Sequence, residues 1–571
     1  MRKQVLIILT LLLVTFRAFA STGEPVKALI QQMEADVDDL SKVYIFRDSP
    51  EYYGRMRVYY NNTLQQLKAI PFKSLEVGEQ VDYLLLKRDV EQELRDIDHN
   101  EKLYNSLQPV IPFAQKIMTL QVNRRRGDTP DAAQVAATLG TVQQEIIAAQ
   151  KALTQQSGLP APVARKAAAI VDGLRSGLRN VYNFYYGYDP SFTWWVKQPY
   201  QQTDSLLKQY ALFLGEELAD KSDKALDASG IRGTPIGRDA LLAQLQYEMI
   251  PYTPEELVDM ANKEFAWCDA EMGKASRAMG FGDDWKKALE KVKEHHVEPG
   301  KQPALIHQLA DEAVKFVEDS NLVTVPALAK EAWRMYMLTM EQQRFAPFFL
   351  GGESILVAYP TAEMDEATKV MSMRSNNYAF AHATVFHELI PGHNLQGYMN
   401  KRNKPYRQMF STPFSVEGWA LYWEMLLWNK NFHSTPEQKV GALFWRMHRC
   451  ARIIFSLNYH LGKWTPQQCI DFLVDRVGHE RFSASAEVRR SFEGNYGPLY
   501  QIAYMMGGLQ LRALHHEMID SRKMTELQFH DAFLHENAIP IEMFRAIITK
   551  QSLTPDFKTQ WRFADQLLKG K

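Results

Sequence analysis

The stretch Phe386–His393 reads FHELIPGH and places two histidines around a glutamate and a Pro-Gly pair. Thirty residues after His387 comes Glu417, at the start of the run EGWALY. Catalytic zinc usually takes three protein ligands, with imidazoles and carboxylates among them, and leaves a fourth position to water or substrate. The pattern therefore predicts a Zn²⁺ site in which His387, His393 and Glu417 bind the ion.

Glu388 is predicted to be the general base of this site rather than a ligand. It follows His387 directly, so on a helix its side chain points about 100° away from that of the histidine. Zinc lowers the pKa of a bound water to about 7, and a neighbouring carboxylate can take a proton from that water. The H-E-x-x-H motif of metalloproteases divides the roles in the same way.

The second histidine stands at an unusual distance from the first. The H-E-x-x-H motif has it four residues on, whereas here Pro391 occupies that position and His393 follows two residues later. On an undistorted helix, six residues would turn His393 about 120° away from His387. Because proline disrupts a helix and glycine permits unusual turns, we expect Pro391 and Gly392 to break the helix and return His393 to the metal.

The two motifs and the segments after them resemble a bacterial family known as domain of unknown function 885. The resemblance is strongest from about Tyr359 to the C-terminus. Further matching positions are Arg452, His460, the GKWT run at 462–465, Glu487–Arg490, Pro498, Tyr504, Gly507, Arg512, Phe529–Ala532 and Pro540. The family commonly has Asp where this chain has Ser456, and Gln where it has Tyr500. These two positions are therefore candidates to tune the choice of substrate.

The resemblance implies a metallopeptidase of mostly α fold. The expected architecture is zincin-like, with long helices around a deep cleft and a small β-sheet beside the metal helix. Through the resemblance, His460 and Tyr504 are candidates to stabilise the oxyanion of a tetrahedral intermediate. Arg512 is a candidate to hold a substrate carboxylate with two hydrogen bonds. The alternative for each of the three is a role as an internal hydrogen-bond partner.

The composition is that of an ordinary globular protein. Of 571 residues, 46% are apolar and 23% are charged, and the formal net charge is −1. No basic excess suggests a nucleic-acid partner or a membrane surface. Cys268, Cys450 and Cys469 are too few for a disulfide framework, although one pair could form in an oxidising compartment. They show no C-x-x-C spacing and are not assigned to metal.

The first twenty residues predict a secretory signal peptide. A basic start is followed by the apolar run Val5–Val14 and by Ala18–Ala20, an A-x-A cleavage site, so the mature chain is expected to begin at Ser21. The apolar run is shorter than the roughly 20 residues that span a bilayer, which favours cleavage over a retained anchor. No cysteine stands at the cleavage point to carry lipid. We therefore expect a periplasmic or secreted protein with no stable membrane anchor.

Residues 21–571 are expected to form one hydrolase domain, with an N-terminal helical lobe at 21–240 and a catalytic lobe at 241–571. Val81–Leu94 and Val142–Leu153 have helical apolar spacing. Leu322–Val325 and Gly351–Tyr359 are the strand candidates. The second strand is a candidate to hold extended substrate through its backbone.

Three helices are expected to carry the site. They are Asn376–Leu389, Glu417–Trp428 and Arg446–Tyr459, the last delivering His460. On the second of these, Glu424 shares a face with Glu417. It is either a carboxylate that accepts a hydrogen bond from a ligand histidine or a surface residue of an amphipathic helix.

The predicted function is zinc-dependent hydrolysis of a peptide bond outside the cytoplasm. Two alternatives remain open at this point. One is an amidase that acts on a non-peptide or modified amino-acid amide, and the other is a non-catalytic binding protein stabilised by zinc. Structural zinc prefers four protein ligands, so a fourth protein ligand would favour the binding protein.

Overall fold

The computed structural model describes residues 24–155, 159–219, 227–494 and 496–568. The predicted signal peptide lies outside them. The chain divides into two compact units, one made of residues 1–222 with Leu553–Pro555 and the other of the remainder. The predicted lobe boundary at residue 240 therefore falls inside the second unit. Within the described ranges, no helix has both the length and the apolar character needed to cross a membrane.

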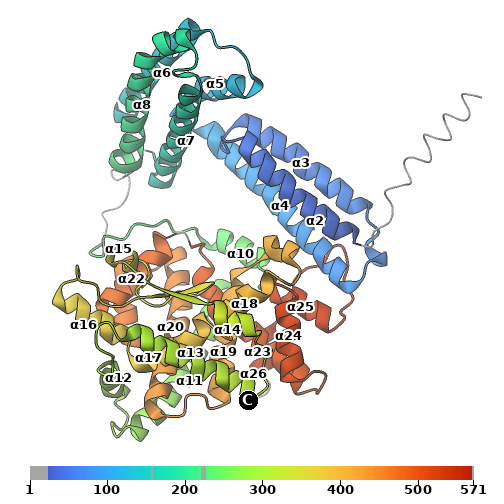
Figure 1. The fold of residues 1–571 in the computed structure, drawn as a ribbon, viewed down its shortest axis with the longest axis vertical. Coiled ribbons are helices and arrows are strands. Elements are labelled where there is room, and N and C mark those ends of the chain that lie inside the picture. The colour runs from blue at the N-terminus through green and yellow to red at the C-terminus, as the bar shows by residue number, and fades with distance from the viewer. Residues whose placement is uncertain (1–23, 156–158, 220–226, 495, 569–571) are drawn as a thin grey trace, which may run out of the picture. The chain divides into compact units, whose positions relative to one another are not determined.

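All the regular secondary structure among the described residues of the first unit is helical. Helices α2, α3 and α4 pack against one another, and α7 packs against both α5 and α8 (Figure 1). The predicted helical segments Val81–Leu94 and Val142–Leu153 are confirmed inside α4 and α6. The elements are α2 (Pro25–Val43), α3 (Pro50–Ala69), a 3₁₀ turn (Phe72–Ser74), α4 (Val77–Ser106), α5 (Ala114–Arg126), α6 (Ala132–Gln155), α7 (Ala161–Tyr185), α8 (Pro190–Leu212) and a π-helical turn (Phe213–Leu218).

The second unit holds the predicted site and is also mostly helical. Its helices before the site are α10 (Arg238–Tyr247), α11 (Pro254–Ala278), α12 (Trp285–Lys293), α13 (Gln302–Asp319), α14 (Ala327–Ala332), α15 (Met340–Gln343) and α16 (Glu366–Ser375). From the site onward they are α17 (Tyr378–Glu388), α18 (His393–Asn400), a 3₁₀ helix (Pro405–Phe410), α19 (Pro413–Asn429), α20 (Pro436–His460), α21 (Pro466–Phe472), a π-helical turn (Leu473–Val477), α22 (Arg481–Phe492), α23 (Tyr500–Ile519), α24 (Glu526–His535), α25 (Ile541–Ile548) and α26 (Phe563–Leu568).

The three helices that carry the site start at polar caps. The side chains of Asn377, Thr412 and Thr435 each accept a hydrogen bond from a backbone N–H in the first turn of α17, α19 and α20. Such caps satisfy N–H groups that have no partner within the helix. The three predicted helices are thus confirmed, although α19 and α20 begin earlier than predicted.

The sheet consists of two short parallel strands, β1 (Arg334–Met337) and β2 (Ser354–Val357). Ile355 and Val357 of β2 belong to the same buried cluster as Val385 of α17 and Leu389, which directly follows α17. The prediction of a small sheet beside the metal helix is therefore confirmed.

One of the two strand predictions is wrong. Gly351–Tyr359 contains β2, but Leu322–Val325 forms no strand and follows the end of α13. Leu322 and Val323 are apolar because their side chains are buried there. A short buried run that ends a helix has the same composition as a short strand, so periodicity alone does not separate the two.

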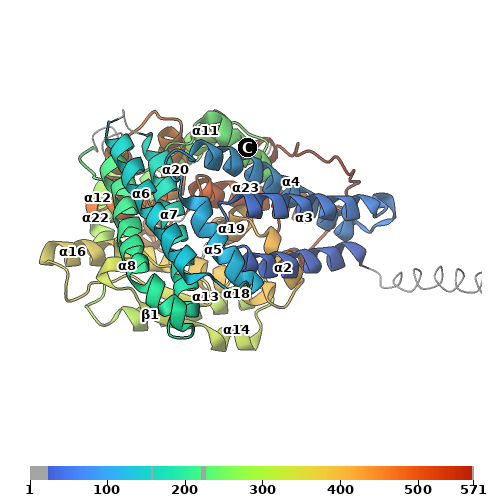
Figure 2. The same ribbon diagram turned by 90° about the horizontal axis from the view of Figure 1, so that it is seen from above.

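Helices α19 and α23 make the closest helix contact of the site. They lie side by side in both views of the ribbon (Figures 1 and 2). Gly507 of α23 faces Gly418 of α19, and a Cβ atom at Gly507 would stand 2.8 Å from the Cα atom of Gly418. Only glycines allow this approach, which sets the distance between Glu417 and the tyrosines of α23.

All three cysteines are buried and free. Burial raises the pKa of the Cys450 thiol, and Cys268 beside it raises that pKa further. Cys268 lies on α11 and Cys450 on α20, two helices that pack along each other. The possible disulfide is thus not formed in this structure, and the thiols serve as part of the core.

Candidate metal centre

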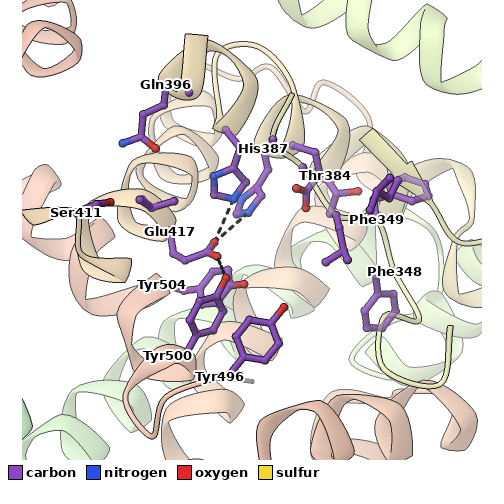
Figure 3. Close-up of a pocket in the computed structure, with 18 of the residues that line it drawn as sticks. Phe348, Phe349, Thr384, His387, Gln396, Ser411, Glu417, Tyr496, Tyr500 and Tyr504 are labelled. Carbon is purple, nitrogen blue, oxygen red and sulfur yellow. Dashed lines mark hydrogen bonds and ion pairs between the residues drawn. The ribbon is translucent and has the colours of Figure 1, made fainter. Parts of the chain in front are cut away.

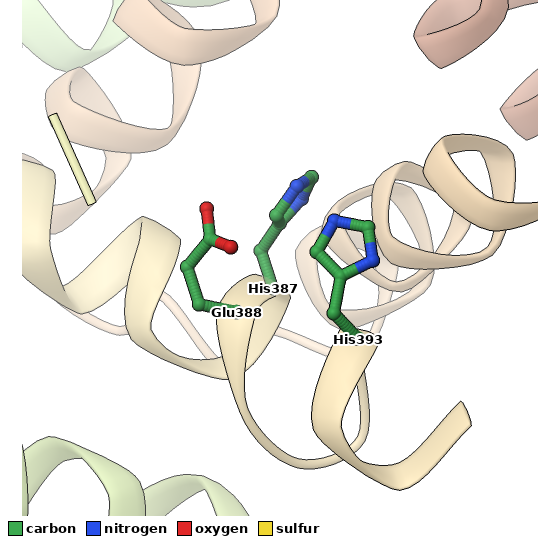
Figure 4. A group of neighbouring side chains, drawn as sticks. All are labelled: His387, Glu388 and His393. Atoms are coloured by element: carbon green, nitrogen blue, oxygen red, sulfur yellow. The ribbon is translucent and has the colours of Figure 1, made fainter. Parts of the chain in front are cut away.

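The two histidines of the motif stand on either side of a break between helices. Helix α17 ends at Glu388 and α18 begins at His393, as predicted for the Pro-Gly pair. The N–H of Gly392 donates to the carbonyl of Phe386 over 3.0 Å, and a Cβ atom at Gly392 would stand 2.6 Å from that oxygen. The break brings the imidazole rings of His387 and His393 to 4.9 Å between centroids (Figure 4).

Glu417 reaches the same point from α19. Its Oε2 lies 3.1 Å from Nε2 of His393 and 3.9 Å from Nε2 of His387 (Figure 3). This oxygen is buried and receives no hydrogen bond of good geometry from the described residues. Two imidazole nitrogens and an oxygen that converge in this way form a donor set that fits zinc. The predicted metal residues are therefore brought together.

Glu388 belongs to the same cluster. It offers a carboxylate oxygen that lies, together with one nitrogen from each of His387 and His393, in a group whose atoms are all within 4.8 Å of one another. Gly351 packs against its carboxylate, and a side chain at Gly351 would collide with Oε2 of Glu388. Burial raises the pKa of Glu388, and the two histidines oppose this effect.

Glu424 occupies the position predicted for a carboxylate behind a ligand histidine. Its Oε1 lies 2.7 Å from Nδ1 of His387 and 3.0 Å from Nη2 of Arg449. Burial opposes ionisation of Glu424, but Arg449 and His387 hold its pKa at about 2. An anionic partner at Nδ1 keeps Nε2 of His387 directed toward Glu417 and available to a metal.

Tyr500 contacts the predicted ligand glutamate directly. Its hydroxyl donates to Oε1 of Glu417, which leaves Oε2 toward the histidines. Burial raises the pKa of Glu417, but His393, His387 and Tyr500 lower it further, so the carboxylate is ionised. Of the two departures from the family pattern, Tyr500 therefore touches the centre, whereas Ser456 donates to the carbonyl of Pro498 over 3.4 Å.

A cleft of about 600 Å³ in the second unit opens onto the metal residues. Tyr496, Tyr500 and Tyr504 line it near Glu417, and Phe348 and Phe349 line it on another side (Figure 3). The cleft is thus walled by aromatic rings, with His387, Glu388 and His393 at its surface.

Tyr504 is the one predicted oxyanion residue that the structure brings to the cleft. Its ring is nearly parallel to that of His387, with centroids 6.2 Å apart. The guanidinium groups of Arg449 and Arg452 lie 4.8 Å and 4.4 Å from the centre of the Tyr504 ring. Burial raises the pKa of Tyr504, so its hydroxyl is protonated.

His460 and Arg512 are not among the described residues that line the cleft. His460 packs against Tyr459 and Phe492, and burial lowers its pKa to about 4. Burial also lowers the pKa of Arg512, with a further contribution from Arg446. The structure therefore does not bring His460 or Arg512 to the surface of this cleft.

Sequence reasoning missed three arginines that do line the cleft, Arg449, Arg452 and Arg490. Two of them stand in segments that resemble the family, but no role was assigned to them. For Arg449 and Arg452 the available signal was their place on the predicted helix Arg446–Tyr459, where an apolar core does not explain charged side chains.

A second group of possible ligands, His515, Glu526 and His530, lies elsewhere in the second unit. Nδ1 of His530 is 2.7 Å from the carbonyl of Leu322, and its Nε2 is 2.8 Å from the hydroxyl of Tyr422. Both ring nitrogens of His530 therefore already have partners, which favours a structural role for this histidine.

Comparison with known proteins gives the family and the fold. The family described as "Bacterial protein of unknown function (DUF885)" matches residues 45–548. A solved "putative lipoprotein of unknown function" from Shewanella oneidensis has a TM-score of 0.68 at 16% identity, over 93% of this chain and 100% of that one. A "putative lipoprotein" from Colwellia psychrerythraea has a TM-score of 0.58 at 16% identity, over 92% and 98%. No curated protein matches the sequence.

Proposed function

We propose that this chain, which belongs to the DUF885 family of bacterial proteins of unknown function, is a zinc-dependent hydrolase of peptide bonds. The observation that carries the proposal is the convergence of His387, His393 and Glu417 beside Glu388 at the surface of a cleft. Three ligands of these types are the set that catalytic zinc uses, and a free carboxylate beside them can serve as base.

Each residue of the centre has a part in the reaction. His387, His393 and Glu417 would hold the ion. When bound, the ion would act as a Lewis acid and lower the pKa of a bound water. Glu388 takes a proton from the attacking water and passes it to the leaving amine. Glu424 and Arg449 fix the orientation of the His387 ring.

Tyr504 has a separate part in this proposal. Its hydroxyl belongs to a side chain that lines the cleft beside His387, and it donates a hydrogen bond to the oxyanion. The burial of the ring keeps that hydroxyl protonated.

Two other functions use parts of the same geometry. A cleft of about 600 Å³ also admits a non-peptide or modified amino-acid amide, since only the amide has to reach Glu388. A zinc-stabilised binding protein would use Glu388 as a fourth ligand, because its carboxylate lies within the histidine cluster. We favour a hydrolase over the binding protein because Glu388 lines an open cleft, whereas a purely structural ligand does not require access to a cleft.

Screening of the zinc-loaded protein against a peptide library tests the proposal. We expect peptide cleavage that a chelator abolishes and added zinc restores, because Glu417 faces both His387 and His393. The products are identified by mass spectrometry. Cleavage that persists after complete removal of metal would show that the centre is not catalytic, and absence of cleavage by fully loaded protein would favour the alternatives.

We also propose that the protein is exported. The N-terminal sequence has the form of a signal peptide, and the two solved structures of the same fold are described as putative lipoproteins. Position 21 is serine, so cleavage after Ala20 is expected to leave a free serine N-terminus. Mass spectrometry of the protein from the extracytoplasmic fraction checks this, and an intact Met1 there would contradict it.

A further inference from the structure

We propose that Arg490, assisted by Arg452, forms a carboxylate-binding site in the cleft, so that the enzyme acts on substrates with a carboxylate beyond the scissile bond. This inference rests on the proposed function and adds the substrate class to it. The sequence assigned the same task to Arg512, which does not reach the cleft. Both the C-terminus of a peptide and an acidic side chain could supply such a carboxylate. We expect the site to bind the free C-terminus.

Arg490 is buried and has N–H donors that make no hydrogen bond with the described residues. It lines the cleft and is only 3% exposed. Its Nε is buried without a hydrogen-bond partner among the described residues. Its Nη1 lies 3.8 Å from Oε2 of Glu487, which is too far for a hydrogen bond. A guanidinium has five N–H donors, and leaving buried donors unpaired is unfavourable. An acceptor that enters the cleft would relieve this.

Glu487 is already committed to another arginine. Its Oε1 accepts from Nε of Arg452 over 2.7 Å and from the side chain of Gln501 over 2.8 Å. Arg452 keeps a further donor, Nη1, that is buried without a partner among the described residues. Arg452 also lines the cleft. Two neighbouring guanidinium groups therefore share one carboxylate and retain positive charge on the cleft wall.

The local charges support an anionic ligand. Arg449 is paired with Glu424, whereas the one carboxylate that pairs with Arg452 and Arg490 among the described residues is that of Glu487. Arginine binds carboxylates through two parallel N–H bonds, and this planar fork distinguishes it from lysine. The arrangement favours one carboxylate, which would bring two acceptor oxygens to these donors.

Two aromatic rings separate this site from the metal centre. The guanidinium of Arg490 lies 4.6 Å from the centre of the Tyr496 ring. The ring centroids of Tyr496 and Tyr500 are 4.1 Å apart. Tyr500 in turn donates to Glu417. A substrate held by its carboxylate at Arg490 would thus extend along the rings of Tyr496 and Tyr500, with its scissile amide near Glu388. This arrangement favours cleavage near the C-terminal end of the substrate.

The test compares the zinc-loaded wild type on N-acetylated tripeptides in two forms, the free acid and the C-terminal carboxamide. Charge-assisted hydrogen bonds predict that kcat/KM favours the acid by about 10- to 100-fold. Arg490→Gln should bring this ratio close to one, and Arg490→Lys should give an intermediate ratio. Arg489→Gln is the matched control, because Arg489 precedes Arg490 on α22 and pairs instead with Glu493. It should keep the wild-type ratio.

A third set of peptides identifies the source of the carboxylate. If the site binds the C-terminal carboxylate, carboxamides with an aspartate in the last position should have the same kcat/KM as the other carboxamides. Cleavage of these at the rate of the free acids would assign the site to an acidic side chain. Equal rates on acid and carboxamide, or an acid preference that survives Arg490→Gln, would overturn the carboxylate site and leave the hydrolase standing.

Binding separates a failure of the site from a failure of the proposed function. Calorimetry with Glu388→Gln protein and the same peptides should show tighter binding of the free acids, and Glu388→Gln/Arg490→Gln should lose this preference. If no peptide is hydrolysed but the acids bind in this way, the proposed function fails and the carboxylate site remains. Equal binding of acid and carboxamide would reject the site.

Discussion

Glu388→Gln is expected to lower kcat by about 10²- to 10⁴-fold, which corresponds to about 3–5 kcal/mol of barrier, while zinc stays bound. Glutamine keeps the shape of the side chain and removes the basic oxygen. The space around Glu388 is fixed by Gly351 and the break after α17, so the substitution fits without rearrangement. Steady-state kinetics and the zinc content of the same preparation are the measurements.

Two comparisons make this result specific to the base. Glu366→Gln changes an exposed glutamate that pairs with Lys369 and does not line the cleft, and it should leave kcat unchanged. A wild-type rate in Glu388→Gln would place the base elsewhere or exclude this kind of hydrolase. Complete loss of zinc would make Glu388 a fourth ligand and would favour the binding protein, since its carboxylate lies within the histidine cluster.

The parts of the site that the sequence predicted are those set by local interactions. The Pro-Gly pair ends α17 as predicted, whereas the capping residues Thr412 and Thr435 start α19 and α20 earlier than predicted. These effects act over a few residues, so they can be read from the sequence. The same holds for Glu424, because its distance from Glu417 along one helix places both carboxylates toward the histidines.

The parts that escaped prediction depend on packing between distant segments. Tyr500 on α23 reaches Glu417 where α23 packs against α19 through facing glycines, and Arg490 on α22 lines the same cleft. No local pattern distinguishes Arg490 from Arg489, which pairs with Glu493 and does not line the cleft. The exposed strand β1 was missed for a similar reason, because its four residues show no alternation of buried and exposed positions.

Glu417→Ala is expected to remove zinc and peptide hydrolysis together, with a larger effect on metal affinity than Glu424→Gln. Glu417 is the carboxylate that faces both histidines, at 3.1 Å and 3.9 Å. Glu424 acts only through His387, and loss of such a partner typically lowers metal affinity by about 10- to 100-fold. Titration with zinc against a competing chelator measures both affinities.

The thermal stability of the same variants gives a second reading that does not depend on activity. A metal that binds only the folded protein stabilises it by about 2.7 kcal/mol at 100 times its Kd, so zinc should raise the Tm of the wild type. The rise should shrink in Glu424→Gln and vanish in Glu417→Ala. A full zinc-dependent rise in Glu417→Ala would show that the ion is held without Glu417. In that case Glu388, the other carboxylate near the histidines, would have to be the third ligand.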